Sequence, residues 1–468
     1  MEGLEISVVK LSEVIKSSYS SRWDSFYFQK EFLKDEKIFE TWESLENIAK
    51  IKSGTTPKER DETLKTGVVL LKTNDIRNNI LLDKGDDYFY ISEATNNEML
   101  SSQIESNDIL INIVGATTEV VGRVSFVPQN FKKANITQAM SFIRLTDSKY
   151  SPFFVFIFLQ TKYGLKQTRR IARPTGQYNI NNIELGSYKV PSVSDTFQSK
   201  IESLVKSAHA KLEESKSLYS QAEDLLLGEL GLKDWQPKNT LHTTKKFSDF
   251  AQSGRLDAEY YQQKYDEIEK ELARFEQIKI KDFINYPVSS GSTPKAGDSQ
   301  YYADCNDGIP FLRAVDIVES RIDTSDLIYI KKDVHNGLLK RTQLKKGDVL
   351  FSIAGTVGRC GIFDYDFEAN INQAVAILRF DETKLKHLYV VQFFNSRIGQ
   401  LIIQKYARQG LQTNLNLDEL SNLSIPILPE QIQKKIASLI QQSFECKAQS
   451  KQLLEDAKLM VETEIEKN

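Results

Sequence analysis

The chain has 468 residues, of which 40% are hydrophobic and 10% aromatic, and it carries a formal net charge of −3. That length leaves room for three or four domains with cores of their own, and the charge excludes a protein that coats nucleic acid with its whole surface. The longest apolar run, residues 153–159, is too short to cross a bilayer, and no basic-then-apolar leader opens the chain. We therefore expect a soluble, cytoplasmic protein that does not enter a membrane.

The second half of the sequence repeats the first at a distance of about 235 residues. Short motifs recur in the same order, and the distance drifts by only a few residues, which places insertions in loops. The matching segments are 22–27 and 255–260, 53–58 and 290–295, 107–110 and 347–350, 122–123 and 358–359, 134–139 and 369–374, and 190–191 and 425–426. This repeat indicates two equivalent domains in one chain.

Each copy predicts the same elements in chain order. A helical segment rich in Tyr and Phe comes first, and short strands broken by Gly, Asn and Asp follow it. A shorter helix and then a long uninterrupted helix complete the copy. The predicted strands are 68–71 and 109–114 in the first copy and 309–312 and 349–354 in the second, and the predicted shorter helices are 150–171 and 385–406. In the first of these helices, the spacing places Phe154, Phe158 and Leu165 on one face.

The long helix of each copy carries apolar or small residues at alternating spacings of four and three, which is the pattern of a coiled-coil seam. The seam positions are Ile201, Val205, Ala208, Leu212, Ser215, Tyr219, Ala222 and Leu226 in the first helix, and Ile436, Ile440, Ser443, Lys447, Ser450, Leu454, Ala457 and Val461 in the second. We expect the two helices to pair with each other as an antiparallel coiled coil, a rod of about 50 Å that holds the two domains apart.

The predicted fold is α+β, with two repeated strand-rich domains separated by the two paired helices in a pseudo-two-fold arrangement. The predicted boundaries are 1–42 for an N-terminal helical segment, 43–192 for the first strand-rich domain, 193–232 for the central helix, 233–277 for a linker that repeats the N-terminus, 278–428 for the second strand-rich domain and 429–468 for the C-terminal helix.

Positive charge gathers at the same place in both copies. Residues 149–189 hold seven basic residues and one acidic residue, and residues 384–419 hold five basic and two acidic residues. A single basic run is usually a solvated face, but its recurrence favours two basic patches that contact phosphates. The central helix is acidic on balance, with eight acids and five lysines over residues 195–234, and would face protein instead.

Motifs that would mark an enzyme are absent from the sequence. No two prolines are adjacent, which excludes the Asn/Asp-Pro-Pro-aromatic motif of amino-methyltransferases, and no Gly-Lys pair forms a phosphate-binding loop. The histidines and cysteines show no metal-ligand spacing. We expect no catalytic residue and no metal site in this chain.

The ordered motifs resemble the specificity subunit of type I restriction-modification enzymes. The resemblance rests on the Thr-Pro pairs that start at Thr56 and Thr293, the Gly-Arg pairs 122–123 and 358–359, the segments 135–138 and 370–373, and the two heptad helices, and it covers essentially the whole chain. It implies two target recognition domains that each read half of a split double-stranded DNA sequence. It further implies two methyltransferase (modification) subunits and restriction/translocase subunits as partners, with S-adenosylmethionine, ATP and Mg in those partners and no cofactor in this chain.

Loop side chains that reach base edges would give such a domain its specificity, and Arg, Asn and Gln can pair bidentately with guanine or adenine. The candidates in the first domain are Lys72, Thr73, Asn74, Thr117, Thr118, Arg169, Arg170, Arg173, Gln177, Tyr178 and Asn179. Those in the second are Arg313, Thr356, Arg359, Lys405, Arg408, Gln409, Gln412, Thr413 and Asn414. Each of these residues has an ordinary turn or a backbone cap as its alternative role.

Asn135, Gln138, Asn370 and Gln373 are identical in two domains that should read different bases, so we expect them to make framework hydrogen bonds. The first domain carries four additional residues between Gly115 and Gly122, which favours an asymmetric target. Two other functions stay open at this point. One is a two-domain scaffold that binds protein and not DNA, and the other is a specificity subunit of a differently built methylation system.

Overall fold

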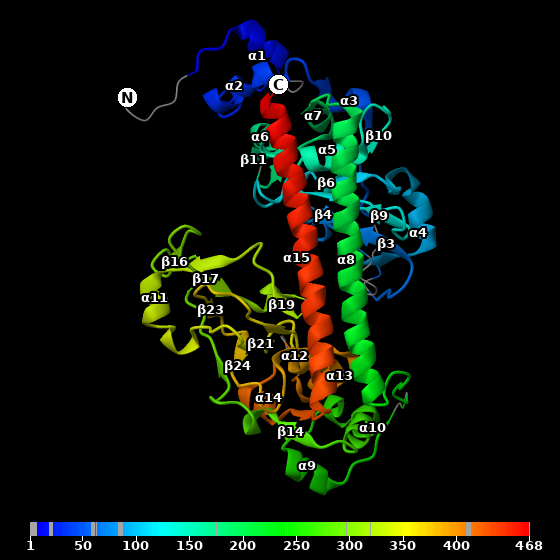
Figure 1. The fold of residues 1–468 in the computed structure, drawn as a ribbon, viewed down its shortest axis with the longest axis vertical. Coiled ribbons are helices and arrows are strands. Elements are labelled where there is room, and N and C mark those ends of the chain that lie inside the picture. Colours follow the sequence, from blue (N-terminus) through cyan, green and yellow to red (C-terminus); the bar gives the residue numbers. More distant parts are fainter. Residues whose placement is uncertain are drawn as a thin grey trace. The chain divides into compact units, whose positions relative to one another are not determined.

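The computed structural model describes residues 7–17, 22–57, 61, 63–82, 88–174, 176–238, 240, 242–295, 297–318, 320–408 and 413–467 (Figure 1). The chain divides into two compact units. The first comprises Met1–Glu213 with Cys446–Asn468, and the second comprises Glu214–Glu445. Each of the two long helices is therefore divided between the units.

The first unit combines short strands with short helices and with parts of both long helices. Its strands are β1 (Glu43–Ser44), β2 (Ala49–Ser53), β3 (Val68–Leu71), β4 (Asn79–Ile80), β5 (Tyr90–Ile91), β6 (Ile109–Asn112), β7 (Val114–Gly115), β8 (Val124–Phe126), β9 (Ala134–Ile136), β10 (Met140–Leu145), β11 (Arg173–Pro174), β12 (Tyr178–Asn179) and β13 (Lys189–Val190). Its helices are α1 (Leu11–Ser17), α2 (Lys30–Phe39), α3 (Leu45–Ile48), α4 (Glu93–Glu98), α5 (Pro152–Phe158), α6 (Lys162–Ile171), α7 (Asn182–Gly186) and the first part of α8 (Asp195–Glu229), with the 3-10 turns η1 (Thr73–Asp75) and η3 (Leu100–Ser102).

A five-stranded sheet with the order β2-β10-β6-β8-β4 forms the centre of the first unit. Its middle strand β6 is buried along its whole length, because both faces of the strand are covered. Ile109 and Ile111 belong to the cluster that contains the phenylalanines of α5, whereas Leu110 belongs to the cluster around β3 and β9. The alternation of side chains along β6 therefore joins a helical layer to a second sheet, β5-β3-β9, in which β3 and β9 run parallel.

The second unit holds the remaining elements. Its strands are β14 (Gln277–Lys279), β15 (Ser289–Ser290), β16 (Tyr302–Ala303), β17 (Ile309–Leu312), β18 (Ile317–Val318), β19 (Arg321–Ile322), β20 (Ile328–Ile330), β21 (Val349–Ser352), β22 (Cys360–Ile362), β23 (Asn370–Ile371), β24 (Val375–Leu378) and β25 (Ser424–Pro426). Its helices are α9 (Phe247–Ser253), α10 (Gln263–Leu272), α11 (Lys332–Asn336), α12 (His387–Asn395), α13 (Arg397–Tyr406), α14 (Leu417–Asn422) and the first part of α15 (Glu430–Lys467), with the 3-10 turns η4 (Ala258–Tyr261), η5 (Ile280–Asp282), η6 (Ala314–Asp316) and η7 (Lys340–Thr342).

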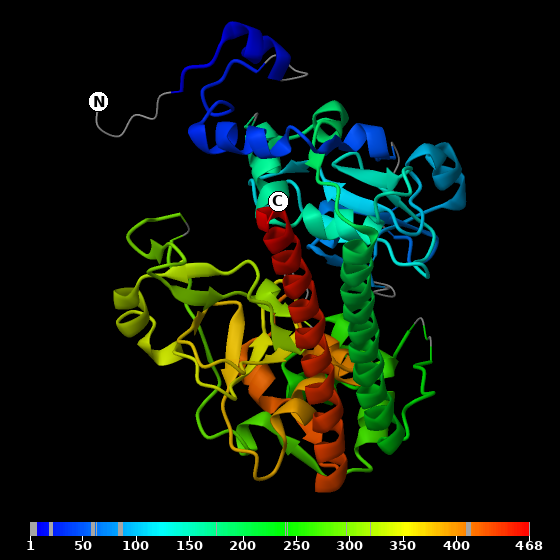
Figure 2. The ribbon, with the colours of Figure 1, turned by 45° about the horizontal axis from the view of Figure 1, so that its top comes forward.

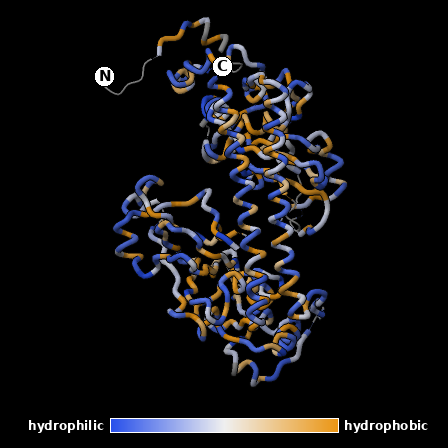
Figure 3. Tube along the Cα trace, viewed as in Figure 1, coloured by the Kyte–Doolittle hydropathy of each residue, from blue (hydrophilic) through white to orange (hydrophobic). Residues whose placement is uncertain are grey.

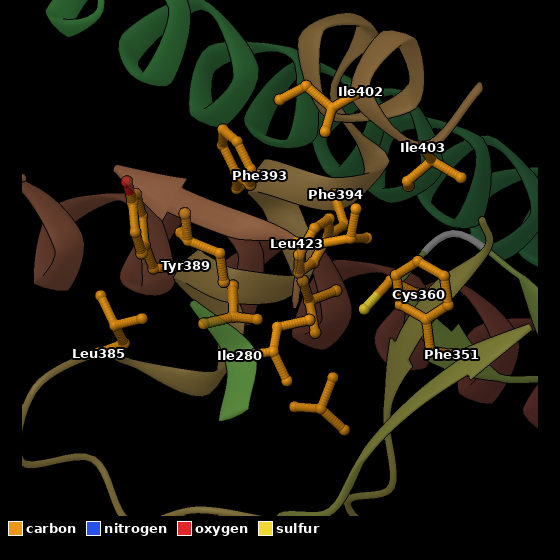
Figure 4. Close-up of a cluster of buried hydrophobic side chains, with 14 of the residues drawn as sticks. Ile280, Phe351, Cys360, Leu385, Tyr389, Phe393, Phe394, Ile402, Ile403 and Leu423 are labelled. Carbon is orange, nitrogen blue, oxygen red and sulfur yellow. The ribbon is translucent and has the colours of Figure 1, made fainter. Parts of the chain in front are cut away.

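The second unit repeats the plan of the first. Its sheet β15-β24-β21-β22 corresponds to β2-β10-β6-β8, and β17 and β23 run parallel as β3 and β9 do. Along β21, Val349 and Phe351 belong to the large cluster that contains α12 and α13, and Leu350 belongs to the cluster around β23. Figure 4 shows part of the larger cluster, in which Phe351 lies near Phe394. The predicted α+β fold with two repeated strand-rich domains is confirmed.

The long helices α8 and α15 are paired antiparallel in each unit. In the first unit, Ser450 Oγ of α15 donates a hydrogen bond to the carbonyl oxygen of Ala208 in α8 at 2.7 Å. In the second unit, Ser443 Oγ donates to the carbonyl oxygen of Ser215 at 2.8 Å. Residue numbers therefore fall along α15 as they rise along α8, and Figures 1 and 2 show the two helices side by side. The predicted coiled-coil pairing is confirmed.

The predicted seam is buried or half-buried at every position but one. Lys447 is exposed, because its ammonium group would lose hydration between two helices, and the preceding Cys446 is buried. The prediction that Lys447 faces the partner helix was therefore wrong. In Figure 3, hydrophobic positions recur among hydrophilic ones along α8 and α15.

Each unit has two helices where the sequence predicts one, α5 then α6 in the first unit and α12 then α13 in the second. The break is made by a hydroxyl residue that caps the second helix: Thr161 accepts a hydrogen bond from the N–H of Gly164, and Ser396 accepts one from the N–H of Gly399. The change of direction leaves Leu165 exposed at 42%, so its predicted place beside the phenylalanines of α5 was wrong.

Gly399 is required by this break, and we expect Gly399→Ala to lower the free energy of unfolding of the second unit by about 1–3 kcal/mol. A Cβ atom at this position would lie 2.0 Å from the carbonyl oxygen of Phe393, a backbone atom that cannot rotate away. Gly228→Ala is the matched control, since a Cβ atom there meets nothing within 4 Å and lies in helix α8. That variant should gain about 1 kcal/mol from helix propensity. Urea unfolding of both variants checks the opposite signs.

In each unit, a buried aspartate directly before strand β6 or β21 binds an arginine, and the two arginines are at equivalent positions. Arg144 donates to Asp108 at 2.8 and 2.7 Å, and Arg379 donates to Asp348 at 2.6 Å through each of two nitrogens. Burial raises the pKa of Asp108, although the hydrogen bonds from Arg144 oppose that rise. The sequence pattern did not single out these pairs, even though both aspartates lie in a repeated segment.

None of the helices that the structure describes is both long enough and apolar enough to cross a membrane.

Candidate nucleic-acid interface

In the first unit, three of the predicted loop segments meet at the end of strand β6. Strand β7 follows β6 directly and pairs with β12, with Tyr178 opposite Gly115 and Asn179 opposite Val114. The side-chain amide of Asn112, the last residue of β6, donates a hydrogen bond to the carbonyl oxygen of Thr73 at 3.1 Å. Segments 72–74, 114–118 and 177–179 are therefore held together, although up to about 100 residues separate them in the chain.

The second unit brings the equivalent segments together. Ala354 forms a β-bridge with Asn414, and the N–H of Gly355 donates to the carbonyl oxygen of Thr413 at 3.2 Å. Arg359 donates from Nη1 to the carbonyl oxygen of Ile317, which follows turn η6 and Arg313, at 3.5 Å. The same three segments thus meet at the end of β21. Gln409 and Gln412, which are also predicted here, lie outside the described residues.

Many of the predicted side chains in these segments are open to solvent. The exposed ones are Asn74, Thr117, Gln177 and Asn179 in the first unit, and Thr356, Arg359, Arg408 and Asn414 in the second. Half-buried ones are Lys72, Thr73, Thr118 and Tyr178 in the first unit, and Arg313 and Thr413 in the second. Lys72 lies over the ring of Phe89 at 3.9 Å, an arrangement that holds the ammonium group beside turn η1.

The basic run of the first unit is not a bare patch. Lys166 Nζ lies 2.8 Å from Asp35, and Arg170 lies against the Tyr27 ring at 4.2 Å and pairs with Glu36. These partners come from helix α2 and the segment before it. Three of the seven basic residues over 149–189 thus pair with the N-terminal segment, and the contact of this run with phosphates stays a prediction.

Arg173 and Arg169 of the same run also have acidic partners. Arg173 donates to Glu184, a residue that is 6% exposed, and Arg169 lies 3.9 Å from Glu31 across a solvent-exposed gap. Arg173 is thus fixed within the domain, whereas Arg169 remains accessible from solvent. Of these two arginines, Arg169 is the surface cation.

The basic run of the second unit behaves in the same way. Lys405 is 8% exposed and pairs with Glu269 at 2.6 Å, while Arg397 donates to the carbonyl oxygen of Trp235 at 2.6 Å. Arg408 pairs with Glu419 at 2.9 Å, yet its side chain is 61% exposed. Lys405 is therefore part of the domain interior, and Arg408 is the predicted cation of this run that faces solvent.

Arg313 is held by acids at the turn that follows β17. Its guanidinium donates to both carboxylate oxygens of Asp316 at 3.0 and 2.9 Å, and to the carbonyl oxygen of Asp326 at 2.7 Å. The side chain remains 29% exposed. This fixed orientation costs no further conformational entropy when a ligand binds, which suits a residue at an interface.

The first of the repeated motifs attaches the N-terminal segment of each copy to the helix that leads into the interface. Arg22 pairs with Asp24 and donates to the carbonyl oxygen of Ile171 at 2.8 Å. Arg255 pairs with Asp257 and donates to the carbonyl oxygen of Tyr406 at 2.9 Å. In both copies the arginine hydrogen bonds hold the pKa of the aspartate below its usual range. This repeated motif thus positions the helix that leads into the interface, a role that the sequence did not reveal.

The expectation of framework hydrogen bonds is confirmed for the two asparagines. Asn135 accepts from Ser102 Oγ at 2.7 Å and donates to the carbonyl oxygen of Met99 at 3.0 Å. Asn370 makes the equivalent bonds with Thr342 and Leu339, at 2.7 and 2.9 Å. Both asparagines are fully buried.

The same expectation is wrong for Gln138 and Gln373. Both side chains are exposed, and neither makes a side-chain hydrogen bond with any residue that the structure describes. Repetition alone made these glutamines resemble framework residues, because the sequence does not show whether the turn directs their side chains inward or to solvent.

Within the described residues, no group of three or more His, Cys, Asp or Glu side chains could hold a metal ion. The interface offers amide, hydroxyl and guanidinium groups, which can donate and accept hydrogen bonds and bind anions.

Comparison with known proteins finds similarity to specificity subunits of type I restriction enzymes. The family model described as Type I restriction modification DNA specificity domain matches residues 273–458. The chain is 28% identical over 141 residues to the Type I restriction enzyme EcoBI specificity subunit of Escherichia coli, which covers 30% of each protein. It is 25% identical over 171 residues to the putative type I restriction enzyme MjaX specificity subunit of Methanocaldococcus jannaschii, over 36% of this chain and 38% of that one. The chain therefore spans about a third of the length of these curated relatives.

Among solved structures, the chain is similar to the S subunit of a type I restriction-modification system from M. genitalium, with 12% identity and a TM-score of 0.38, over 91% of this chain and 94% of that one. The match to the family model lies on the second strand-rich domain and its helix. The first domain repeats the second in motif order and in strand order. Residues 273–458 thus match the type I restriction modification DNA specificity domain, and the chain is similar to specificity subunits of type I restriction enzymes.

Proposed function

We propose that this chain is the DNA-recognition subunit of a type I restriction-modification complex and that it reads a bipartite double-stranded target. The observation that carries the proposal is the gathering of three equivalent loop segments at one strand end in each unit. Loops that converge from distant parts of the chain can present several side chains to adjacent base pairs. Two such loop sets in one chain suit two half-sites with an unread spacer between them.

An asymmetric target is supported by the differences between the two loop sets. The connection from Gly115 to Gly122 is four residues longer than the connection from Gly355 to Gly358, and Thr117 and Thr118 lie in the longer one. Arg359 and Arg408 supply exposed guanidinium groups in the second unit. Guanidinium groups favour guanine in the major groove, so we expect a guanine in the second half-site.

Partner subunits would perform the chemistry in this proposal. Two methyltransferase subunits that use S-adenosylmethionine would methylate adenine in the two half-sites, and restriction/translocase subunits that use ATP and Mg would cut unmethylated DNA. The complex would work in the cytoplasm. The two curated relatives are named as specificity subunits of type I restriction enzymes, which supports this division of labour.

Binding to duplex DNA tests the proposal against a protein-binding scaffold. The complex of this chain with its methyltransferase should bind a duplex carrying its target with an affinity that falls steeply with salt. Arg359→Ala should weaken binding to that duplex by about 10-fold to 100-fold, because one base or phosphate contact is worth roughly 1–3 kcal/mol.

Arg274→Ala is the control, since this exposed arginine pairs with Glu271, three residues before it in the chain. The control should bind as the unaltered chain does. A complex that binds no duplex at any salt concentration, or whose affinity does not depend on salt, would favour the protein-binding scaffold. The specificity subunit of a differently built methylation system would still bind DNA, but without a type I partner.

A further inference from the structure

Gln138 and Gln373 occupy the same turn in the two units, between the parallel strand β9 or β23 and the antiparallel strand β10 or β24. In the first unit, the N–H of Met140 closes this turn onto the carbonyl oxygen of Thr137 at 3.0 Å. In the second, the N–H of Val375 closes it onto the carbonyl oxygen of Asn372 at 3.2 Å. The side chains of both glutamines are exposed.

The turn of the first unit is tied to two of the three segments at the candidate interface. The carbonyl oxygen of Ala139 accepts from the N–H groups of Ile113 and Val114 at 3.0 and 3.2 Å, and the N–H of Thr137 donates to the carbonyl oxygen of Leu71 at 3.3 Å. Leu71 immediately precedes the predicted Lys72, and Val114 leads to the predicted Thr117. Gln138 therefore lies where two of the variable loop segments begin.

The turn of the second unit is tied in the same way. The carbonyl oxygen of Ala374 accepts from the N–H of Ile353 at 2.8 Å, and the N–H of Asn372 donates to the carbonyl oxygen of Leu312 at 2.9 Å. The N–H of Gln373 itself donates to Thr293 Oγ1, in the Thr-Pro motif, at 3.3 Å. This bond fixes the backbone of the glutamine and leaves its side-chain amide to solvent.

The repeated glycine before each Thr-Pro motif shows how closely this turn is held. A Cβ atom at Gly54 would lie 2.2 Å from the carbonyl oxygen of Ile136, and one at Gly291 would lie 1.9 Å from that of Ile371. Each glycine thus lets two backbones approach directly behind the glutamine. An exposed side chain on a rigid backbone is preorganised for binding, because the backbone loses little conformational entropy when the side chain binds.

Resting on the proposed function, we infer that Gln138 and Gln373 are paired anchors that donate a side-chain amide hydrogen bond to the sugar–phosphate backbone, one in each half-site. Side chains that read bases should differ between two domains with different half-sites, as the neighbouring loops do. A side chain that is identical in both domains suits the sugar–phosphate backbone, which is identical in both half-sites. Side-chain amide groups commonly donate hydrogen bonds to phosphate oxygens. The contact positions each domain on its half-site and carries no base preference.

The test measures DNA affinity of the complex with its methyltransferase for two duplexes, one with the methylated target and one of equal length with that target scrambled. Gln138→Ala and Gln373→Ala should each weaken binding about tenfold, and by the same factor on both duplexes, because a hydrogen bond to a charged group is lost. The dependence of affinity on salt should stay unchanged, since a neutral amide displaces no counterion. Gln441→Ala, on the exposed face of α15, is the control and should change neither value.

The thermal midpoint of each variant should equal that of the unaltered chain, because no buried partner loses a bond. Weakening confined to the target duplex would make the glutamines base readers and overturn the inference, and unchanged affinity on both duplexes would overturn it as well. If the unaltered complex bound neither duplex, the proposed function itself would fail, and the inference with it.

Discussion

Asp348→Ala should lower the free energy of unfolding of the second unit by about 3–5 kcal/mol, the usual cost of removing one partner from a buried ion pair. Asp348 is 1% exposed, and its carboxylate accepts both hydrogen bonds from Arg379 as well as the N–H of Lys345 at 2.7 Å. Alanine would leave the guanidinium without a counter-charge and the backbone donor without an acceptor. Urea unfolding followed by amide hydrogen exchange, resolved by peptide, measures the loss in this unit.

Asp366→Ala is the matched control for this change. Asp366 pairs with Lys346 at 3.1 Å, but its side chain is 87% exposed, and a solvated pair of this kind is worth at most about 1 kcal/mol. Equal losses for the two alanine variants would contradict the role of Asp348 as a buried anchor. Peptides of the first unit should keep their exchange rates in both variants.

Ala222→Glu should destabilise the second unit by about 3 kcal/mol or more, because it places a carboxylate in the seam between α8 and α15. Ala222 and Ile436 are both fully buried and belong to one hydrophobic cluster. No room is left there for water to solvate the charge. The unfolding free energy, measured in urea at neutral pH, gives the size of the effect.

Gln221→Glu adds the same charge one position earlier on the exposed face of α8. This control should change the unfolding free energy by no more than about 0.5 kcal/mol. If both variants were equally stable, the pairing of the two helices in this unit would not depend on the seam.

The sequence predicted those features that depend on periodicity and repetition. Strands such as 109–114 were recognisable because apolar residues fill both faces, and the helix pairing followed from a seam of eight positions along each long helix. The two asparagines at 135 and 370 were identified as framework residues from repetition alone. Each of these features is visible in the order and spacing of residues along the chain.

The features that were mispredicted depend on residues far apart in the chain or on local geometry. The ion pair of Lys166 in the basic run 149–189 was not recognised, because its partner Asp35 lies over 100 residues earlier. The break before α6 depends on Thr161 and Gly164, and threonine and glycine also occur inside ordinary helices. The exposure of Gln138 depends on the direction of one turn, which composition does not encode. A hydroxyl residue followed three positions later by glycine, repeated at Ser396 and Gly399, was the signal available for the break.

Genome-wide mapping of adenine methylation shows whether this chain directs methylation to a DNA sequence. It compares cells that carry this chain and its methyltransferase with cells that lack this chain alone. We expect the deletion to remove one methylated motif, which is bipartite and has two unlike half-sites. An unchanged methylation map would contradict the role of this chain in DNA recognition.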